Sequence, residues 1–216
     1  MKRLALLAVL VLLLSVSSFG LSISIFDPGN SPITSLAWSL NGSVITIEET
    51  WTGSGRGFLL FDDLDLSTEY TVYKNIWNYT GTDWNLFSDE LLDPTGQQND
   101  IDYDDPIAPW VPDRFSHSNN MDNLWFGYDV ARTSTSFATL YVDELAGRDF
   151  LEFSDGLVSG LGGYEVQMFG LQNMDVENEP FLLAQRPNEH SIVPEPATLM
   201  LLGSGLIGIG LARRKK

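Results

Sequence analysis

Cysteine is absent from the 216-residue sequence, and basic residues are scarce outside its two ends. Without cysteine the chain has no disulfides, so its stability must come from a packed core alone. Between residues 21 and 192 there are 6 basic and 28 acidic residues, a formal charge of −22. Such a body repels nucleic-acid phosphates and anionic lipid, which excludes nucleic acid as a partner.

The common catalytic motifs are also missing. Neither H-E-x-x-H nor G-x-S-x-G occurs, and there is no cysteine nucleophile. The two histidines, His117 and His190, lie in a serine-rich polar segment and in a linker. We therefore expect the protein not to be an enzyme. A glycoside hydrolase that uses a pair of carboxylates stays an alternative, because 28 acidic residues offer many pairs and the sequence does not reveal the distances between them.

Long apolar runs occur only at the two ends. Residues 1–20 combine Lys2 and Arg3, an apolar run that ends at Leu14, and a small-residue stretch that ends at Gly20. This order is typical of a secretory signal peptide cut before Leu21, although a cut after Ser17 fits nearly as well. The run is shorter than the roughly 20 residues of a membrane span. A permanent N-terminal anchor is the alternative.

The C-terminal 24 residues, 193–216, have three parts in a fixed order. An apolar stretch over 197–212 is preceded by Val193, Pro194, Glu195 and Pro196, and is followed by Arg213, Arg214, Lys215 and Lys216. As a helix, the apolar stretch would extend about 24 Å, slightly less than the hydrocarbon core. The basic end favours the cytoplasmic side, which places the acidic body outside. We expect a transmembrane helix over residues 197–212. Only the two ends of the precursor are expected to contact the membrane.

This C-terminal arrangement resembles the PEP-CTERM sorting signal of Gram-negative bacteria. The resemblance implies that signal peptidase and an exosortase process the protein during export. It also implies passage through the inner membrane to the cell surface or to an exopolysaccharide matrix. The bodies that carry such signals are diverse, and the body of this chain resembles no domain family that we recognise. A plain C-terminal membrane anchor is the alternative.

Between the ends, the sequence pattern predicts one all-β domain over residues 21–185 and a linker over residues 186–192. Twelve Phe, seven Tyr and six Trp supply large apolar side chains for a core. Short segments rich in aromatic and branched residues, bounded by Gly, Asp, Asn or Ser and almost without helical periodicity, favour an antiparallel, Greek-key-like β-sandwich. Besides a hairpin, the expected strands are 58–61, 71–77, 85–92, 124–130, 136–142, 150–153, 164–170 and 181–185.

The hairpin is expected at Asn41-Gly42, a dipeptide that suits a type I′ turn. This turn would place Leu40 opposite Ser43 and Trp38 opposite Ile45, with the apolar side chains on one face. Further on, Leu64, Thr68 and Tyr70 have the spacing of a tyrosine corner, in which the phenol hydroxyl bonds to upstream backbone and holds a crossover between sheets. An ordinary strand tyrosine is the alternative.

Two acidic clusters are candidates for cation binding. Asp100, Asp102 and Asp104 alternate as in loops that bind Ca²⁺ through carboxylate oxygens. The segment is not an EF-hand, because Asp105 stands where the loop needs Gly and Val111 where it needs Glu. The alternatives are a looser Ca²⁺ site or a solvated acidic loop. A weaker candidate consists of Asp62, Asp63 and Asp65.

Trp84 and Trp110 lie in segments rich in polar residues or proline. Each could stack on a sugar ring if exposed, or pack on the edge of the core. Taken together, the sequence favours an exported, non-catalytic surface or matrix protein. A carbohydrate- or calcium-binding module is the first alternative, and a secreted hydrolase is the second.

Overall fold

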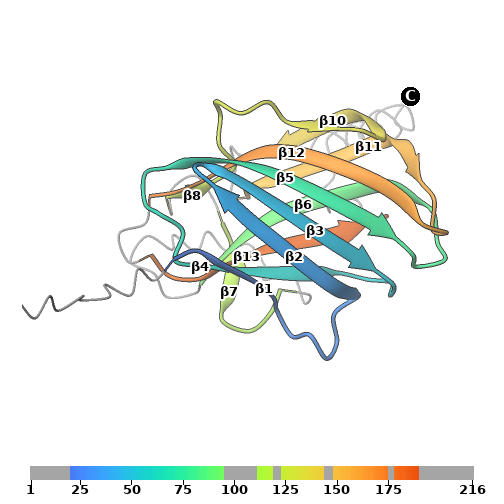
Figure 1. Cartoon of the computed structure of the whole chain (residues 1–216), viewed down its shortest axis with the longest axis horizontal. Helices are drawn as coiled ribbons and strands as arrows, with labels where there is room; N and C mark the ends of the chain where they lie inside the picture. Colours follow the sequence, from blue (N-terminus) through green and yellow to red (C-terminus); the bar gives the residue numbers. More distant parts are fainter. Residues whose placement is uncertain (1–19, 95–110, 119–122, 144–147, 175–177, 190–216) are drawn as a thin grey trace, which may run out of the picture.

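The computed structural model describes residues 20–94, 111–118, 123–143, 148–174 and 178–189 (Figure 1). The expected signal peptide up to residue 19, the sorting segment with its expected membrane helix, the calcium candidates Asp100, Asp102 and Asp104, and Trp110 lie outside these residues. Within the parts of the chain that are described, no helix has the length and apolar character to span a bilayer.

The described residues form an all-β fold with two sheets, as the sequence predicts. Sheet A contains, in spatial order, β1 (Ser22–Ile25), β4 (Gly57–Asp62), β13 (Phe181–Pro187), β6 (Trp84–Pro94), β11 (Phe150–Val158) and β10 (Phe137–Asp143), with β7 (Phe115–His117) paired to β6. Sheet B contains β2 (Ile33–Asn41), β3 (Val44–Trp51), β5 (Glu69–Asn78), β12 (Gly163–Asn173) and β8 (Leu124–Trp125), with β9 (Thr133–Ser134) paired to β12.

The two sheets lie one behind the other, with sheet B towards the viewer in Figure 1. One hydrophobic cluster contains side chains of both: Ile45 and Val72 of sheet B are fully buried with Phe61 and Phe87 of sheet A. Since strand side chains alternate between faces, each of these strands contributes every second residue to this core. The shared core is that of a two-layer sandwich.

Sheet B differs from the predicted antiparallel sheet in one pair of strands. β3 and β5 are parallel, with Ile45 opposite Val72 and Ile47 opposite Lys74. A parallel pair needs a crossover connection, and here the intervening strand β4 joins sheet A. The chain therefore leaves one sheet after β3 and returns to it at β5, and local sequence pattern does not encode the parallel pairing that results.

The hairpin forms where it was expected, but the predicted register is wrong. The two-residue loop is Gly42-Ser43, Asn41 belongs to the strand, and Leu40 lies opposite Ile45 rather than Ser43. Gly42 has a φ of 60° and Ser43 is not among the residues with positive φ, a pattern that suits a type II′ turn with Gly first. The shift is two residues, so the apolar side chains keep the face that the alternation predicted.

The connection from β4 to β5 has the contacts of a tyrosine corner. Tyr70 and Leu64 are buried, and the Tyr70 hydroxyl bonds to the Asp65 backbone and to the side chains of Asp65 and Thr68. This connection is a crossover from sheet A to sheet B. The upstream bonds of Tyr70 thus hold the chain at the point where it changes sheets.

Several strand boundaries differ from the predictions. The segment predicted as a strand over 124–130 is paired only at Leu124–Trp125, while β11 and β12 extend beyond their predicted ends. The short strands β1, β7 and β9 were not predicted at all. β13 continues to Pro187, two residues into the segment 186–192 predicted as a linker.

Candidate functional site

Neighbouring residues of β6 carry buried carboxylates on opposite faces of sheet A. Asp89 shares a face with Phe87 and Leu91, which belong to the core between the sheets. Glu90 shares a face with Leu92, which belongs to a second, smaller apolar cluster on the far side of sheet A. Both carboxylates are fully buried. Because buried charge needs compensation, each one requires its own set of partners.

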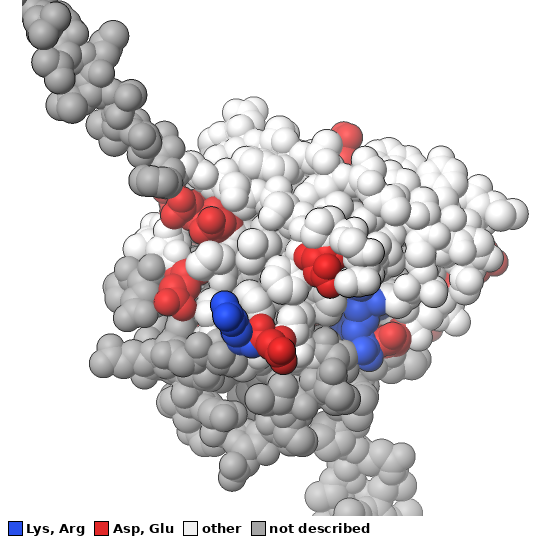
Figure 2. Space-filling view, turned by 90° about the horizontal axis from the view of Figure 1, so that it is seen from below, with Lys and Arg blue, Asp and Glu red and all other residues white. Residues whose placement is uncertain are grey.

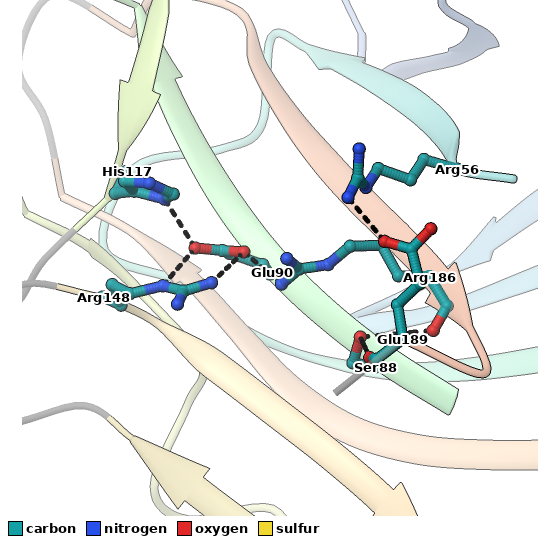
Figure 3. A network of polar contacts seen from close by, with 7 residues as sticks. All are labelled: Arg56, Ser88, Glu90, His117, Arg148, Arg186 and Glu189. Carbon is teal, nitrogen blue, oxygen red and sulfur yellow. Dashed lines mark hydrogen bonds and ion pairs between the residues drawn. The ribbon is translucent and has the colours of Figure 1, made fainter. Parts of the chain in front are cut away.

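Glu90 is surrounded by basic side chains (Figure 3). Its Oε1 accepts from Arg148 Nε at 2.7 Å and lies 2.6 Å from His117 Nδ1. Its Oε2 accepts from Arg148 Nη2 at 2.7 Å and from Arg186 Nη2. The carboxylate therefore receives a two-pronged contact from one guanidinium and further contacts from two other residues, the strong form of a charge-assisted hydrogen bond.

These contacts determine the ionisation of Glu90. Burial by itself would raise the pKa, but the hydrogen bonds from His117 and Arg148 and the charges of Arg186 and Arg148 outweigh it. Together they lower the pKa of Glu90 from 4.5 to about 2. Glu90 is thus an ionised carboxylate at neutral pH.

The partners of Glu90 come from separate elements. His117 ends β7, Arg148 precedes β11, and Arg186 lies near the end of β13. The guanidinium carbons of Arg148 and Arg186 lie 5.1 and 5.2 Å from the centre of the Phe150 ring, which adds a cation–π contact to each ion pair. The Glu90 cluster therefore connects three neighbouring strands and the short strand β7.

A second ion pair continues the cluster towards the end of the described body. Arg56 Nη2 lies 2.6 Å from Glu189 Oε2. The Ser88 hydroxyl lies 3.2 Å from the Arg186 carbonyl and 3.5 Å from that of Glu189. On the side seen from below, acidic groups are scattered, and the visible basic groups lie beside acidic ones (Figure 2).

A different polar cluster lies between the sheets. Lys74 of β5 is fully buried, contacts Asp89 Oδ1, and lies 4.5 Å from the centre of the Phe87 ring. Glu49 of β3 is also fully buried; its Oε2 accepts from Trp51 Nε1 at 2.9 Å and its Oε1 from Gln185 Nε2 at 3.2 Å.

This inner cluster contains more acid than base. Glu165 of β12 is fully buried too, and its carboxylate accepts from the hydroxyls of Ser134 and Thr135. Lys74 contacts Asp89, and its charge also acts on Glu49. Burial raises the pKa of Glu49 and of Asp89, and the charge of Lys74 opposes this rise in both. For Glu49 and Asp89 the direction of the shift is the reverse of that for the pKa of Glu90.

The structure does not support Trp84 as a sugar platform. Its side chain is 2% exposed and packs edge-on against Trp51, with ring centres 5.6 Å apart. The indole therefore belongs to the core, because β6 begins at Trp84 and points this residue between the sheets. Trp110, the second candidate, lies outside the described residues.

Of the two predicted cation sites, Asp62, Asp63 and Asp65 lie within the described residues, whereas Asp100, Asp102 and Asp104 lie outside them. No group of three or more His, Cys, Asp or Glu side chains within them could hold a metal ion, so Asp62, Asp63 and Asp65 do not form one. Asp63 has a φ of 57° at the end of β4, and Asp65 bonds to Tyr70. These residues therefore shape the crossover between the sheets.

Sequence reasoning missed both buried clusters. His117 was interpreted as an ordinary loop residue, and none of its partners was singled out. One signal was available: the acidic run Asp89-Glu90 lies inside the apolar strand sequence from Leu86 to Leu92. Successive strand residues point to opposite faces of a sheet, so two successive charges cannot both face solvent when both faces also carry apolar residues, as Phe87 and Leu91 on one face and Leu92 on the other. That pattern indicates buried charge, although it does not reveal the partners.

Comparison with known proteins identifies the end of the chain and not its body. No curated protein and no solved structure matches the chain. Residues 193–216 match the family model described as the PEP-CTERM protein-sorting motif, which confirms the resemblance found in the sequence. This motif indicates an exported protein that is processed by an exosortase and sorted towards the cell surface.

Proposed function

We propose that this protein is a non-catalytic component of the bacterial surface or of the exopolysaccharide matrix, to which it is delivered by exosortase processing. The sorting motif at 193–216 carries the proposal, because it implies an exosortase as partner and the outside of the cell as destination. The acidic composition of residues 21–192 suits this location, since a strongly charged body stays soluble there.

The two polar clusters support a structural role for their members. Lys74, Asp89 and Glu90 are fully buried, and each contacts a partner of opposite charge. A general acid or base must reach a proton on a substrate. Side chains enclosed in this way are suited to joining strands.

Mass spectrometry of the protein purified from its own host tests the processing. We expect the mature protein to lack residues 206–216, and the variant Glu195→Ala/Pro196→Ala to retain them. The variant Glu179→Ala/Pro180→Ala is a matched control, because it removes the same dipeptide from a position before β13. It should be processed like the natural protein.

Retention of Leu206 to Lys216 in the mature protein would contradict sorting and leave a protein anchored by its C-terminus. Fractionation of the same cells tests the destination: the processed form should be found in the surface or matrix fraction. Hydrolysis of a polysaccharide by the purified protein, abolished by neutralising one carboxylate, would contradict the non-catalytic role.

A further inference from the structure

The outward face of sheet B combines aromatic side chains with very little charge. Its central positions on β3, β5 and β12 form three cross-strand rows. In order across the strands, the rows are Thr50, Trp77 and Tyr164, then Glu48, Asn75 and Val166, then Thr46, Tyr73 and Met168. Glu48 is the one charged residue in these rows. In a body with 28 acidic residues, such a face is unusual.

The rings of this face are held in place and partly exposed. Trp77 and Tyr164 are cross-strand neighbours with ring centres 4.9 Å apart and planes at 44°. The Tyr164 hydroxyl donates to Asn75 Oδ1 at 2.6 Å, while Asn75 Nδ2 donates to the Ile47 carbonyl at 3.3 Å. Tyr164 is 46% exposed and Tyr73 is 39% exposed. A ligand would therefore meet rings whose orientation is already determined.

We propose that this face binds a neutral polysaccharide chain. The apolar C–H face of a sugar ring packs on an aromatic ring, and its hydroxyls need polar partners nearby. Trp77 and Tyr164 supply the rings. Polar partners lie nearby, with Thr50 in the same row as these rings and Glu48 in the next row. Tyr73 and Trp77 are four residues apart on β5, which separates them by about 13 Å along the strand. Rings at that spacing contact different sugar units of one extended chain.

Charge decides between the possible partners of this face. An acidic polysaccharide or an anionic lipid surface would be repelled by a body of formal charge −22. A basic protein would have Glu48 as its one counter-charge in these rows. An apolar protein surface would remove water from the polar side chains of Asn75, Thr46 and Thr50, which costs free energy. A neutral glycan satisfies both the rings and the polar groups.

Affinity electrophoresis of the full chain in a mild detergent tests the inference. The gels contain one of four neutral polysaccharides, namely hydroxyethyl cellulose, a soluble β-1,3-glucan, a galactomannan or a soluble starch, with acidic alginate as a fifth probe. We expect at least one neutral polymer to retard the protein and alginate not to do so. Trp77→Ala and Tyr164→Ala should each weaken the retardation about tenfold, the loss that follows removal of a stacked ring.

Tyr141→Ala is the matched control, because Tyr141 is 43% exposed and lies on β10 of the other sheet. This variant should bind like the natural protein, and circular dichroism should show all three variants folded. The inference is overturned if no neutral polymer retards the protein, if the face variants bind normally, or if alginate or a protein partner binds this face instead. It goes beyond the proposed function, whose processing is measured separately and would stand after any of these results.

Discussion

At the scale of single residues, the main feature is the pair of adjacent carboxylates on β6. Asp89 points between the sheets and Glu90 points to the far side of sheet A. Glu90 has an excess of basic partners, which lowers its pKa, whereas burial raises the pKa of Asp89 against the opposing charge of Lys74. The carboxyls on the two faces of β6 thus contribute to the stability of the fold with opposite dependences on pH.

Glu90→Gln is expected to destabilise the fold by about 3–5 kcal/mol, because Arg148 and Arg186 would lose their buried counter-charge. Denaturant unfolding measures this difference in the free energy of unfolding. Glu48→Gln is the control, since Glu48 is exposed on β3, and its change should stay within about 0.5 kcal/mol. Equal effects of the two substitutions would show that the Glu90 contacts contribute little.

The contribution of Glu90 should depend on pH in a defined direction. A carboxyl whose folded pKa lies below its unfolded pKa stabilises the fold above the unfolded pKa, and the contribution is lost as pH falls through the folded pKa. For Glu90 the window runs from 4.5 down to about 2. This difference corresponds to about 3 kcal/mol.

Unfolding experiments from pH 6 to pH 2 on the natural protein and on Glu90→Gln check this expectation. The difference in free energy between the two proteins should be largest above pH 4.5 and should decrease below it. Comparing the two proteins cancels the opposite pH dependence of Glu49 and Asp89. A difference that stays constant over this range would contradict the ion-pair account.

At the scale of elements, the crossover between β4 and β5 organises the fold. It takes the chain from sheet A to sheet B and makes β5 the parallel neighbour of β3. Tyr70 is the second residue of β5 and bonds back to Asp65, so one buried side chain ties the start of β5 to the preceding connection.

Tyr70→Phe should lower the free energy of unfolding by about 0.5–1.5 kcal/mol, since it removes the hydroxyl and leaves the ring in place. Tyr73→Phe is the control: Tyr73 lies on the same strand but on the exposed face. Urea unfolding of both variants measures the effect. If Tyr70→Phe is as stable as the control, the bonds to Asp65 do not stabilise the crossover.

At the scale of the whole molecule, the end of the described body is fixed by its own contacts. The end of the described body is tied to the sheets by Arg56 and Glu189, and by Asn188, which donates to the Asp83 carbonyl at 2.8 Å and accepts from the Asn85 amide at 2.9 Å. These contacts all precede the motif at 193–216. These contacts join residues of the body to one another, so they remain when the motif is removed.

We expect processing to leave the thermal midpoint of the body unchanged within about 2 °C, the shift caused by roughly 0.5–1 kcal/mol in a domain of this size. The comparison uses the processed protein from its host and the unprocessed Glu195→Ala/Pro196→Ala variant in the same detergent. A decrease of many degrees after processing would show that the sorting segment contributes to the fold.

The sequence by itself determined the features that depend on neighbouring residues. Strand alternation predicted the all-β class and the inward face of the hairpin, and the ordered Pro-Glu-Pro, apolar and basic parts of residues 193–216 carried the resemblance to the sorting motif. The partners of Glu90 come from residues 27, 58 and 96 positions away, and no local pattern relates them. The tertiary structure alone decided these pairs, the parallel pairing of β3 with β5 and the burial of Trp84. The physical reason is that turn chemistry and alternation act over a few residues, whereas strand order and charge compensation depend on which distant segments the shared core brings together.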